Sequence, residues 1–144
     1  MERVTILMSI KPYFAERILK GIKKFELRRK VGEIPERSRI VIYASSPLKA
    51  IIGEFIAGRV IEGDPNFIWN FVARIPNSGI EIKDWPYIKG AKTALAIEVL
   101  APKRYDYPLS LEEIRSRIPH FQPPMSYKRV RPGEPLFIIL NKLK

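Results

Sequence analysis

The sequence lacks cysteine altogether and contains a single histidine, His120. The absence of cysteine excludes disulfides, thiol catalysis and cysteine-ligated zinc. One histidine is also too few for the usual zinc sites that are built from other ligands. No apolar run approaches the roughly 20 residues that a membrane-spanning helix requires. We therefore expect a protein without a metal, a cofactor or a membrane span.

Acidic residues are scarce relative to basic ones. Lysine and arginine total 26 against 15 aspartates and glutamates, which gives a formal net charge of +11. Such an excess favours polyanionic partners: RNA, DNA or an acidic membrane surface. The chain is also rich in isoleucine and proline and poor in glutamine and asparagine, which is typical of thermophiles. Because thermophilic composition usually raises glutamate together with lysine, we favour a functional basic surface.

The length of 144 residues and the hydrophobic content of 46% suit one globular domain, residues 1–144. We find no internal repeat and no low-complexity tail. Met1-Glu2-Arg3 leads directly into an apolar, strand-like run, so we expect no signal or transit peptide and take the cytoplasm as the default compartment. The sequence does not indicate an oligomeric state.

A helix, a glycine turn and a strand follow one another near the N-terminus. Apolar residues at helical spacing predict a helix over Pro12–Lys20, and Gly21 is suited to end it in the left-handed conformation. The period then changes to two: Phe25 and Leu27 point to one side, and the charged residues between them to the other. Such a strand forms either an exposed sheet surface or the wall of a polar cleft.

The remaining pattern predicts a small α+β protein or a partly closed barrel. Gly53 and Gly58 within one long strand indicate bends or bulges where a sheet curls. The segment Ala101–Pro108 is too rich in proline for a central strand. Besides the strand at Phe25, we expect strands over Val4–Ile10, Arg39–Tyr43, Ile51–Glu62, Thr93–Leu100 and Leu136–Leu140, and helices over Asn66–Ile75 and Leu111–Arg117.

The pattern G-x-K-x-x-E-x-R over Gly21–Arg28, directly after an amphipathic helix, resembles the signature of the ASCH domain, a branch of the PUA-like superfamily. The resemblance covers nearly the whole chain and is closest to single-domain archaeal members. It implies a PUA-like β-pseudo-barrel of about six strands with short flanking helices. The other segments that carry it are Met8–Pro12, Tyr43–Pro47, Lys49–Gly53, Tyr105–Leu109 and Pro123–Tyr127.

The resemblance implies that this signature lines a cleft beside the first strand, with Lys23, Glu26 and Arg28 as neighbours. Lysine and arginine supply donors for phosphate or base edges, and the carboxylate orients them or accepts from a base. Lys23 reaches the cleft only if it belongs to the turn, since in the strand it would share a face with Phe25. The alternative is a surface ion pair of little energetic worth. Lys11 and Ser45, from the other segments that carry the resemblance, complete the predicted cleft.

A second candidate element lies late in the chain, at Pro123-Pro124-Met125-Ser126-Tyr127-Lys128-Arg129-Val130-Arg131. An aromatic beside three cations is typical of a platform for single-stranded nucleic acid, where Tyr127 stacks on a base while Lys128, Arg129 and Arg131 contact phosphates. The alternative is a solvated loop whose tyrosine packs on the barrel. The sequence favours neither.

Two function classes remain open. The first is an RNA-binding module in RNA metabolism or translation-linked regulation. The second is a hydrolase, since some ASCH proteins are ribonucleases and others remove the acyl group from acetylated cytidine. The resemblance implies that those amidohydrolases use a lysine and a threonine of the signature; Lys23 matches the lysine, but Glu26 occupies the threonine position. A ribonuclease with Glu26 as general base and Lys23 stabilising the phosphorane is the enzymatic alternative. We favour the binding module.

Overall fold

The computed structural model describes residues 3–144, which form six strands, four α-helices and one 3₁₀ helix. Met1 and Glu2, in which we expected no targeting signal, lie outside the described residues. In chain order the elements are β1 (Thr5–Ile10), α1 (Pro12–Leu19), β2 (Phe25–Arg29), β3 (Arg39–Ala44), β4 (Ala50–Gly63), α2 (Pro65–Ala73), the 3₁₀ helix η1 (Ile82–Tyr87), β5 (Ala94–Ser110), α3 (Leu111–Arg117), β6 (Tyr127–Val130) and α4 (Pro135–Leu140).

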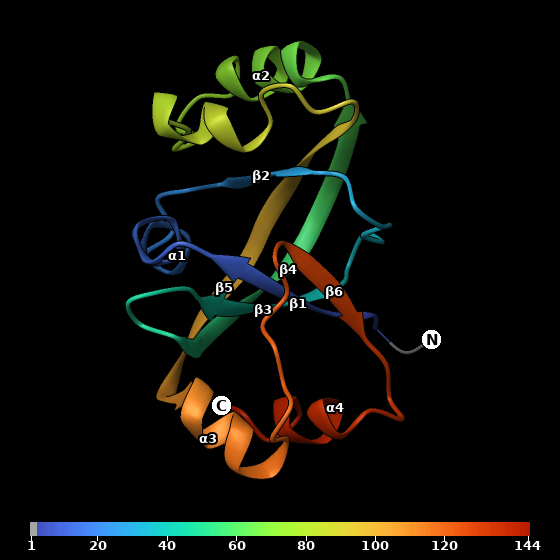
Figure 1. The fold of residues 1–144 in the computed structure, drawn as a ribbon. Coiled ribbons are helices and arrows are strands. Elements are labelled where there is room, and N and C mark those ends of the chain that lie inside the picture. Colours follow the sequence, from blue (N-terminus) through green and yellow to red (C-terminus); the bar gives the residue numbers. More distant parts are fainter. Residues whose placement is uncertain (1–2) are drawn as a thin grey trace.

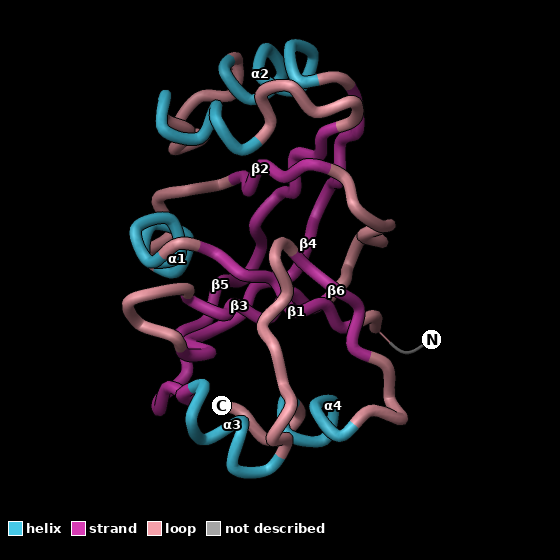
Figure 2. Tube along the Cα trace, viewed as in Figure 1, coloured by secondary structure: helices cyan, strands magenta, loops and turns pink. Residues whose placement is uncertain are grey.

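All six strands belong to one sheet in the order β2-β5-β4-β3-β1-β6. Only β1 and β3 are parallel; every other neighbouring pair of these strands is antiparallel. The long strands β4 and β5 run the length of the molecule, with α2 at the upper end and α3 and α4 at the lower end (Figure 1). Helices therefore gather at the two ends and strands in between (Figure 2). This curled half-barrel confirms the predicted α+β class.

The sheet packs against three apolar clusters, one at its centre and one toward each end. The central cluster packs the buried face of α1, including Phe14 and Ile18, against β1, β3, β4 and β5. A second cluster joins α3 and α4 to the sheet, and a third joins Phe25 and Leu27 of β2 to α2. Burial of apolar side chains on both faces of the sheet is the main stabilising term. Gly21, just past the end of α1, has a φ of +76°, the left-handed conformation that was predicted.

The glycines of β4 lie where the pairing is irregular. The register between β4 and β5 shifts between Ile51 and Gly53 and again between Ala57 and Val60, the stretch that contains Gly58. Bulges of this kind bend a strand and increase its twist, so they curl the sheet into a half-barrel. The bends predicted at the two glycines are confirmed.

The segment Ala101–Pro108, predicted to be too rich in proline for a central strand, is nevertheless part of a strand, because β5 continues to Ser110. β2 pairs with β5 only as far as Glu98, so the later half of β5 has a free edge. Proline is tolerated on such an edge, where its missing N–H is not needed. Pro102 and Pro108 also fall within register shifts against β4, where ladder hydrogen bonds are interrupted anyway.

The predicted strand over Leu136–Leu140 is also wrong, since these residues form the helix α4. Leu136, Ile139 and Leu140 are buried while Ile138 is 58% exposed, which is helical spacing. A five-residue apolar run fits a strand or a helix equally, and Pro135 at the first helical position favours the helix. The strand β6, Tyr127–Val130, was not predicted from the sequence.

The two edge strands, β2 and β6, close the half-barrel through side chains. The Tyr127 hydroxyl accepts hydrogen bonds from the N–H groups of Val31 (2.9 Å) and Gly32 (3.1 Å) and donates one to the carbonyl of Gly32 (2.7 Å). Arg28 of β2 donates to the carbonyl of Ser9 at the end of β1 at 2.6 Å. The two side chains thus bridge the opening that no backbone ladder closes.

Tyr127→Phe keeps the ring and removes the hydroxyl that joins β6 to residues 31–32. We expect the free energy of unfolding to fall by about 1–3 kcal/mol, because the freed backbone groups lose buried partners. Denaturant unfolding measures the change. The matched control is Tyr107→Phe, whose hydroxyl belongs to an 83% exposed residue and whose loss should cost nothing measurable. Unchanged stability in Tyr127→Phe would contradict the role of this hydroxyl in closing the half-barrel.

Candidate functional site

The predicted signature residues are neighbours, and their side chains are buried. Lys23 lies in the connection before β2, so it belongs to the turn as the prediction required. Glu26 and Arg28 face away from the apolar cluster that holds Phe25 and Leu27. The exposed fractions of Lys23, Glu26 and Arg28 are 0%, 4% and 6%. The surface ion pair considered as the alternative is therefore wrong.

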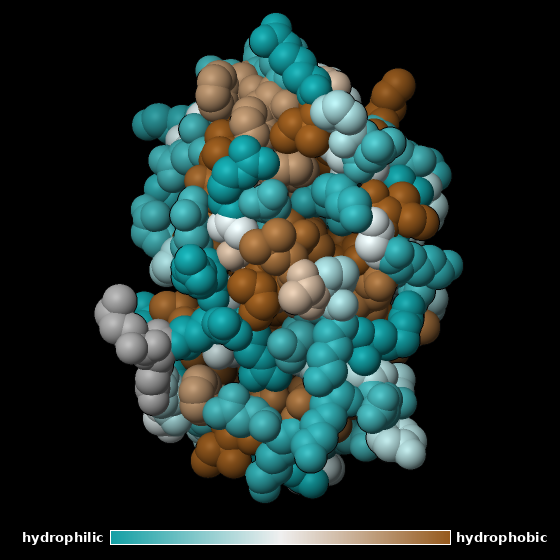
Figure 3. Space-filling model, turned by 180° about the vertical axis from the view of Figure 1, so that it is seen from behind, coloured by the Kyte–Doolittle hydropathy of each residue, from teal (hydrophilic) through white to brown (hydrophobic). Residues whose placement is uncertain are grey.

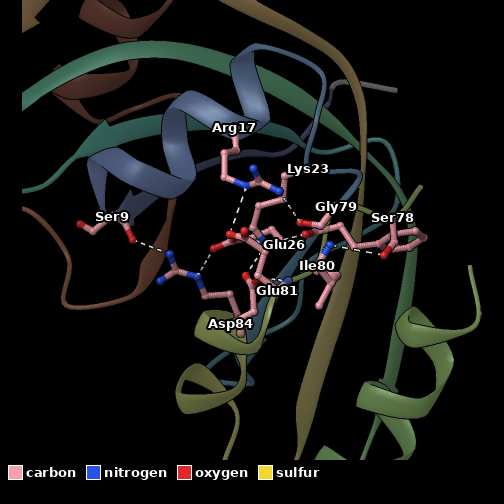
Figure 4. A network of polar contacts seen from close by, with 11 residues as sticks. Ser9, Arg17, Lys23, Glu26, Ser78, Gly79, Ile80, Glu81 and Asp84 are labelled. Carbon is pink, nitrogen blue, oxygen red and sulfur yellow. Dashed lines mark hydrogen bonds and ion pairs between the residues drawn. The ribbon is translucent and has the colours of Figure 1, made fainter. Parts of the chain in front are cut away.

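The ammonium of Lys23 is completely enclosed by acceptors (Figure 4). Its Nζ lies 3.1 Å from Oε1 of Glu26 and 2.8 Å from Oδ1 of Asp84, and it donates to the carbonyl of Phe25 at 2.6 Å. These three acceptors use all three of its N–H donors. Oε2 of Glu26 accepts from Nε of Arg28 at 2.8 Å. We call Lys23, Glu26, Arg28 and Asp84 the charge network.

Asp84 comes from η1, far along the chain, and the sequence did not indicate it. Its second oxygen accepts the backbone N–H of Glu81 at 2.9 Å, which fixes the carboxylate in a capping box. The preceding segment is held close to Lys23 because the N–H of Lys24 donates to the carbonyl of Ser78. Gly79 permits this approach, since a Cβ there would overlap the carbonyl oxygen of Ile22. The four charges of the network sum to zero.

The network is unsuited to the catalytic roles that the sequence suggested. Burial alone would raise the pKa of Glu26, but the charges of Lys23 and Arg28 and their hydrogen bonds hold it below its ordinary value. A general base works best with a pKa near the operating pH. Lys23 has no exposed surface and no spare donor with which to meet a phosphorane. The geometry therefore favours a structural role for Lys23 and Glu26 over the predicted roles of Glu26 as base and of Lys23 as oxyanion stabiliser or phosphate ligand.

Arg28 connects the network to a surface cleft. Its Nη2 donates to the carbonyl of Ser9, and its Nη1 lies 3.4 Å from the hydroxyl of Ser126. The guanidinium also lies 5.8 Å from the ring centre of Tyr87, a cation–π distance. One end of Arg28 is thus fixed in the network while the residue forms part of the cleft wall.

The cleft brings together the predicted residues Lys11, Arg28 and Ser45 and has a volume of about 320 Å³. Of the described residues, those that line it include three cations, five hydroxyl side chains and no carboxylate. The lining residues are Ser9, Lys11, Arg28, Tyr43, Ser45, Ser46, Lys49, Tyr87, Leu111, Pro123, Pro124 and Met125.

Sequence reasoning missed several cleft residues, of which Lys49 is the most important. It follows the turn after β3 and has a φ of 50°, an uncommon left-handed conformation for a residue other than glycine. Tyr43 at the end of β3 and Tyr87 at the end of η1 were also missed. The signal available was the segment Tyr43–Lys49, which carries a lysine and three hydroxyls within seven residues.

The late basic residues lie outside this cleft. Tyr127, proposed as a stacking platform, is only 8% exposed and packs in the central core, so the alternative of a packed tyrosine is the one that fits. Lys128, Arg129 and Arg131 are exposed and line a separate groove beside β6.

A pocket larger than the cleft lies on α2 and is mainly apolar. It has a volume of about 470 Å³ and is lined by Phe67, Asn70, Phe71, Arg74 and Ile75. Seen from behind, hydrophobic side chains reach the surface at the upper end of the molecule, where α2 lies (Figure 3). With one cation and one amide, this pocket has less to offer a polyanion than the cleft does.

Two further properties concern metals and membranes. Residues 3–144 contain no group of three or more histidine, aspartate or glutamate side chains placed to hold a metal ion. Within the same residues, no helix has the length and apolar character needed to cross a membrane.

Lys23→Met removes one charge from the charge network and leaves two carboxylates with one cation. We expect the free energy of unfolding to fall by about 3–5 kcal/mol, because an uncompensated buried charge remains. Asp84→Asn, which keeps an acceptor for Glu81, restores neutrality when combined with Lys23→Met. The double variant should therefore lose less stability than the sum of the single variants, with a coupling of about 1–3 kcal/mol in denaturant unfolding.

The matched control is the exposed pair Arg104 and Glu16, whose side chains are 48% and 36% accessible. Arg104→Met should change stability by no more than about 1 kcal/mol. Additive effects of Lys23→Met and Asp84→Asn would contradict the coupled network.

The chain resembles known proteins over almost its whole length, although no protein-family model matches it. It is 31% identical over 134 residues to an ASCH domain-containing ribonuclease of Zymomonas mobilis, covering 92% of this chain and 88% of the relative. A crystal structure of ASCH from Zymomonas mobilis has a TM-score of 0.82 at 26% identity, covering 99% of this chain and 98% of that one. The N-terminal domain of Staphylothermus marinus McrB shares the fold at a TM-score of 0.55 and 16% identity, covering 99% and 98% of the two chains. The half-barrel, the neighbouring residues of the signature and this similarity together lead to one conclusion: the chain belongs to the ASCH domain family.

Proposed function

We propose that the protein binds RNA through the cleft beside β1. The observation that carries the proposal is the composition of the cleft wall: Lys11, Lys49 and Arg28 with five hydroxyls and, among residues 3–144, no carboxylate. Cations attract phosphate, and hydroxyls form hydrogen bonds with phosphate, ribose and base edges. The net charge of +11 adds a long-range attraction for any polyanion.

The size of the cleft and the relative's name favour RNA among polyanions. A volume of about 320 Å³ suits one nucleotide unit of a single strand. Sequence-specific RNA recognition usually takes place on unpaired nucleotides, and the 2′-hydroxyl gives a hydroxyl-rich wall a means of distinguishing RNA from DNA. The relative that is 31% identical is named as a ribonuclease, which supports RNA as the ligand.

Ribonuclease activity is a second candidate, and the name of that relative is the observation that favours it. Cleavage requires the 2′-oxygen to lose a proton and attack phosphorus while the 5′-oxygen leaves with a proton. Because the charge network is closed to substrate and the cleft wall has no carboxylate, a solvent water accepts the 2′-proton, and the cleft supplies the cations and the proton for the leaving oxygen. Lys11 and Lys49 supply charge for the phosphorane, and Tyr43 supplies a hydroxyl. Burial raises the pKa of Tyr43, which keeps its proton available for the leaving oxygen.

Lys11→Ala and Lys49→Ala together remove the two exposed cations of the cleft. We expect weaker binding to single-stranded RNA and a smaller salt dependence, with log K against log[salt] becoming shallower by about 1.4, or 0.7 for each lost phosphate contact. Fluorescence titrations with 2′-O-methyl oligouridine at several salt concentrations measure this without cleavage. The control, Lys92→Ala with Lys20→Ala, removes the same charge from exposed positions outside the cleft and should alter the slope less. Equal slopes in the two double variants would contradict the cleft as the binding site.

The ribonuclease candidate predicts that wild type converts labelled RNA into fragments with 2′,3′-cyclic phosphate ends. Lys49→Ala and Tyr43→Phe should each lower the rate by about 10²–10⁴-fold while the fold stays intact. The same sequence as DNA should remain uncut, because it has no 2′-oxygen to attack. Gel analysis of the products, with Lys92→Ala as control, is the measurement. Absence of turnover in wild type, with RNA binding retained, leaves the protein as a binding module.

A further inference from the structure

A second basic groove lies along β6 on the surface of the half-barrel. It has a volume of about 410 Å³ and contains the exposed residues Lys128, Arg129 and Arg131. None of these three side chains forms an ion pair with a carboxylate of residues 3–144. The residues that line the groove are Ile6, Val31, Gly32, Glu33, Tyr127, Lys128, Arg129 and Arg131.

The groove is positive despite the presence of one acidic residue. Glu33 is its single carboxylate among the described residues, and that carboxylate lies 2.7 Å from Nζ of Lys30. Lys128 lies 5.4 Å from the ring centre of Phe121, which orients its ammonium without neutralising it. Lys30 also pairs with Glu62, at 2.8 Å, so Glu33 is only partly neutralised. The three cations still outnumber the one carboxylate of the groove, and phosphates are the complementary groups.

The groove continues the cleft along the same piece of chain. Met125 lines the cleft, and Ser126 lies beside Arg28. The residues that follow them and border the groove are Tyr127, Lys128, Arg129 and Arg131. A strand advances about 3.3 Å per residue, so Met125 and Arg131 are separated by at most roughly 20 Å along β6. Tyr127, whose hydroxyl fastens β6 to Gly32, keeps the two sites at a fixed separation.

We propose that an RNA strand held in the cleft continues across β6 into this groove, so that the protein binds an extended single strand of several nucleotides. The inference rests on the proposed function and deepens it, because it specifies the class of RNA. A single strand can turn from the cleft into the groove and place its phosphates beside Lys128, Arg129 and Arg131. A stiff duplex cannot enter a cleft that takes one nucleotide.

The experiment compares a trimer and a dodecamer of 2′-O-methyl oligouridine with three forms of the full chain. The forms are wild type, a groove variant with Lys128→Ala, Arg129→Ala and Arg131→Ala, and a control with Lys20→Ala, Lys89→Ala and Lys92→Ala. The two variants lose equal charge, and the control residues are exposed and line neither site. For the dodecamer we expect the salt slope to become shallower by about two in the groove variant, at 0.7 for each phosphate. The trimer should bind the groove variant and the control equally.

Each of the following three outcomes would overturn the inference. If the groove variant and the control bind the dodecamer with the same slope, the groove takes no part in RNA binding. If duplex RNA of the same length binds wild type as tightly as the dodecamer, the strand does not have to enter the cleft. If oligoglutamate binds wild type and loses affinity in the groove variant while the dodecamer does not, the groove serves an acidic peptide. Failure of the proposed function is distinguishable, because Lys11→Ala with Lys49→Ala would then leave binding of both oligonucleotides unchanged.

Discussion

The structure depends on a set of four buried charges that must neutralise one another. Removing a carboxylate or an ammonium from water costs several kcal/mol, and only close pairing with full hydrogen bonding offsets that cost. Lys23 meets this requirement with two carboxylates and a carbonyl, and Glu26 meets it with Lys23 and Arg28. The four residues come from the connection after α1, from β2 and from η1. Their pairing therefore fixes these elements relative to β1, which Arg28 reaches through the carbonyl of Ser9.

The need to pair every buried charge distinguishes the buried cations from those that are free to bind a ligand. A buried cation is fully paired, so Lys23 has nothing left for a ligand. Lys11 and Lys49, in contrast, lie on a wall without carboxylates, and Lys128, Arg129 and Arg131 lie in a groove whose one carboxylate is bound to Lys30. Part of the excess of basic residues is thus available to a ligand in the cleft and in the groove.

Local patterns were sufficient to predict much of the fold and part of the cleft. The change from helical spacing to period two around Gly21, and the glycines of β4, depend on neighbouring residues and were predicted correctly. The features that the sequence analysis missed or predicted wrongly depend on residues that are distant in the chain. Asp84 pairs with Lys23 from a distant part of the chain, and the Tyr127 hydroxyl bonds to the backbone of Gly32. The prolines of β5 are tolerated because β2 pairs with β5 only as far as Glu98 and because the register against β4 shifts there. The short apolar run of α4 fits a helix or a strand equally, and its packing against the sheet decides between them.

The position of Glu26 shows how the family signature acts in this chain. The resemblance implies that amidohydrolases of the family have a threonine there and use it in catalysis. Here the side chain is a carboxylate that Lys23 and Arg28 hold ionised, since they keep its pKa below the ordinary value against the opposing effect of burial. An ionised, enclosed carboxylate with both oxygens occupied can neither attack a substrate nor take up a proton near neutral pH. The cleft, in contrast, has Lys11 and Lys49 exposed on its wall, the first placed directly after β1 and the second by the turn after β3. The signature residue Glu26 thereby holds Arg28 in the cleft wall.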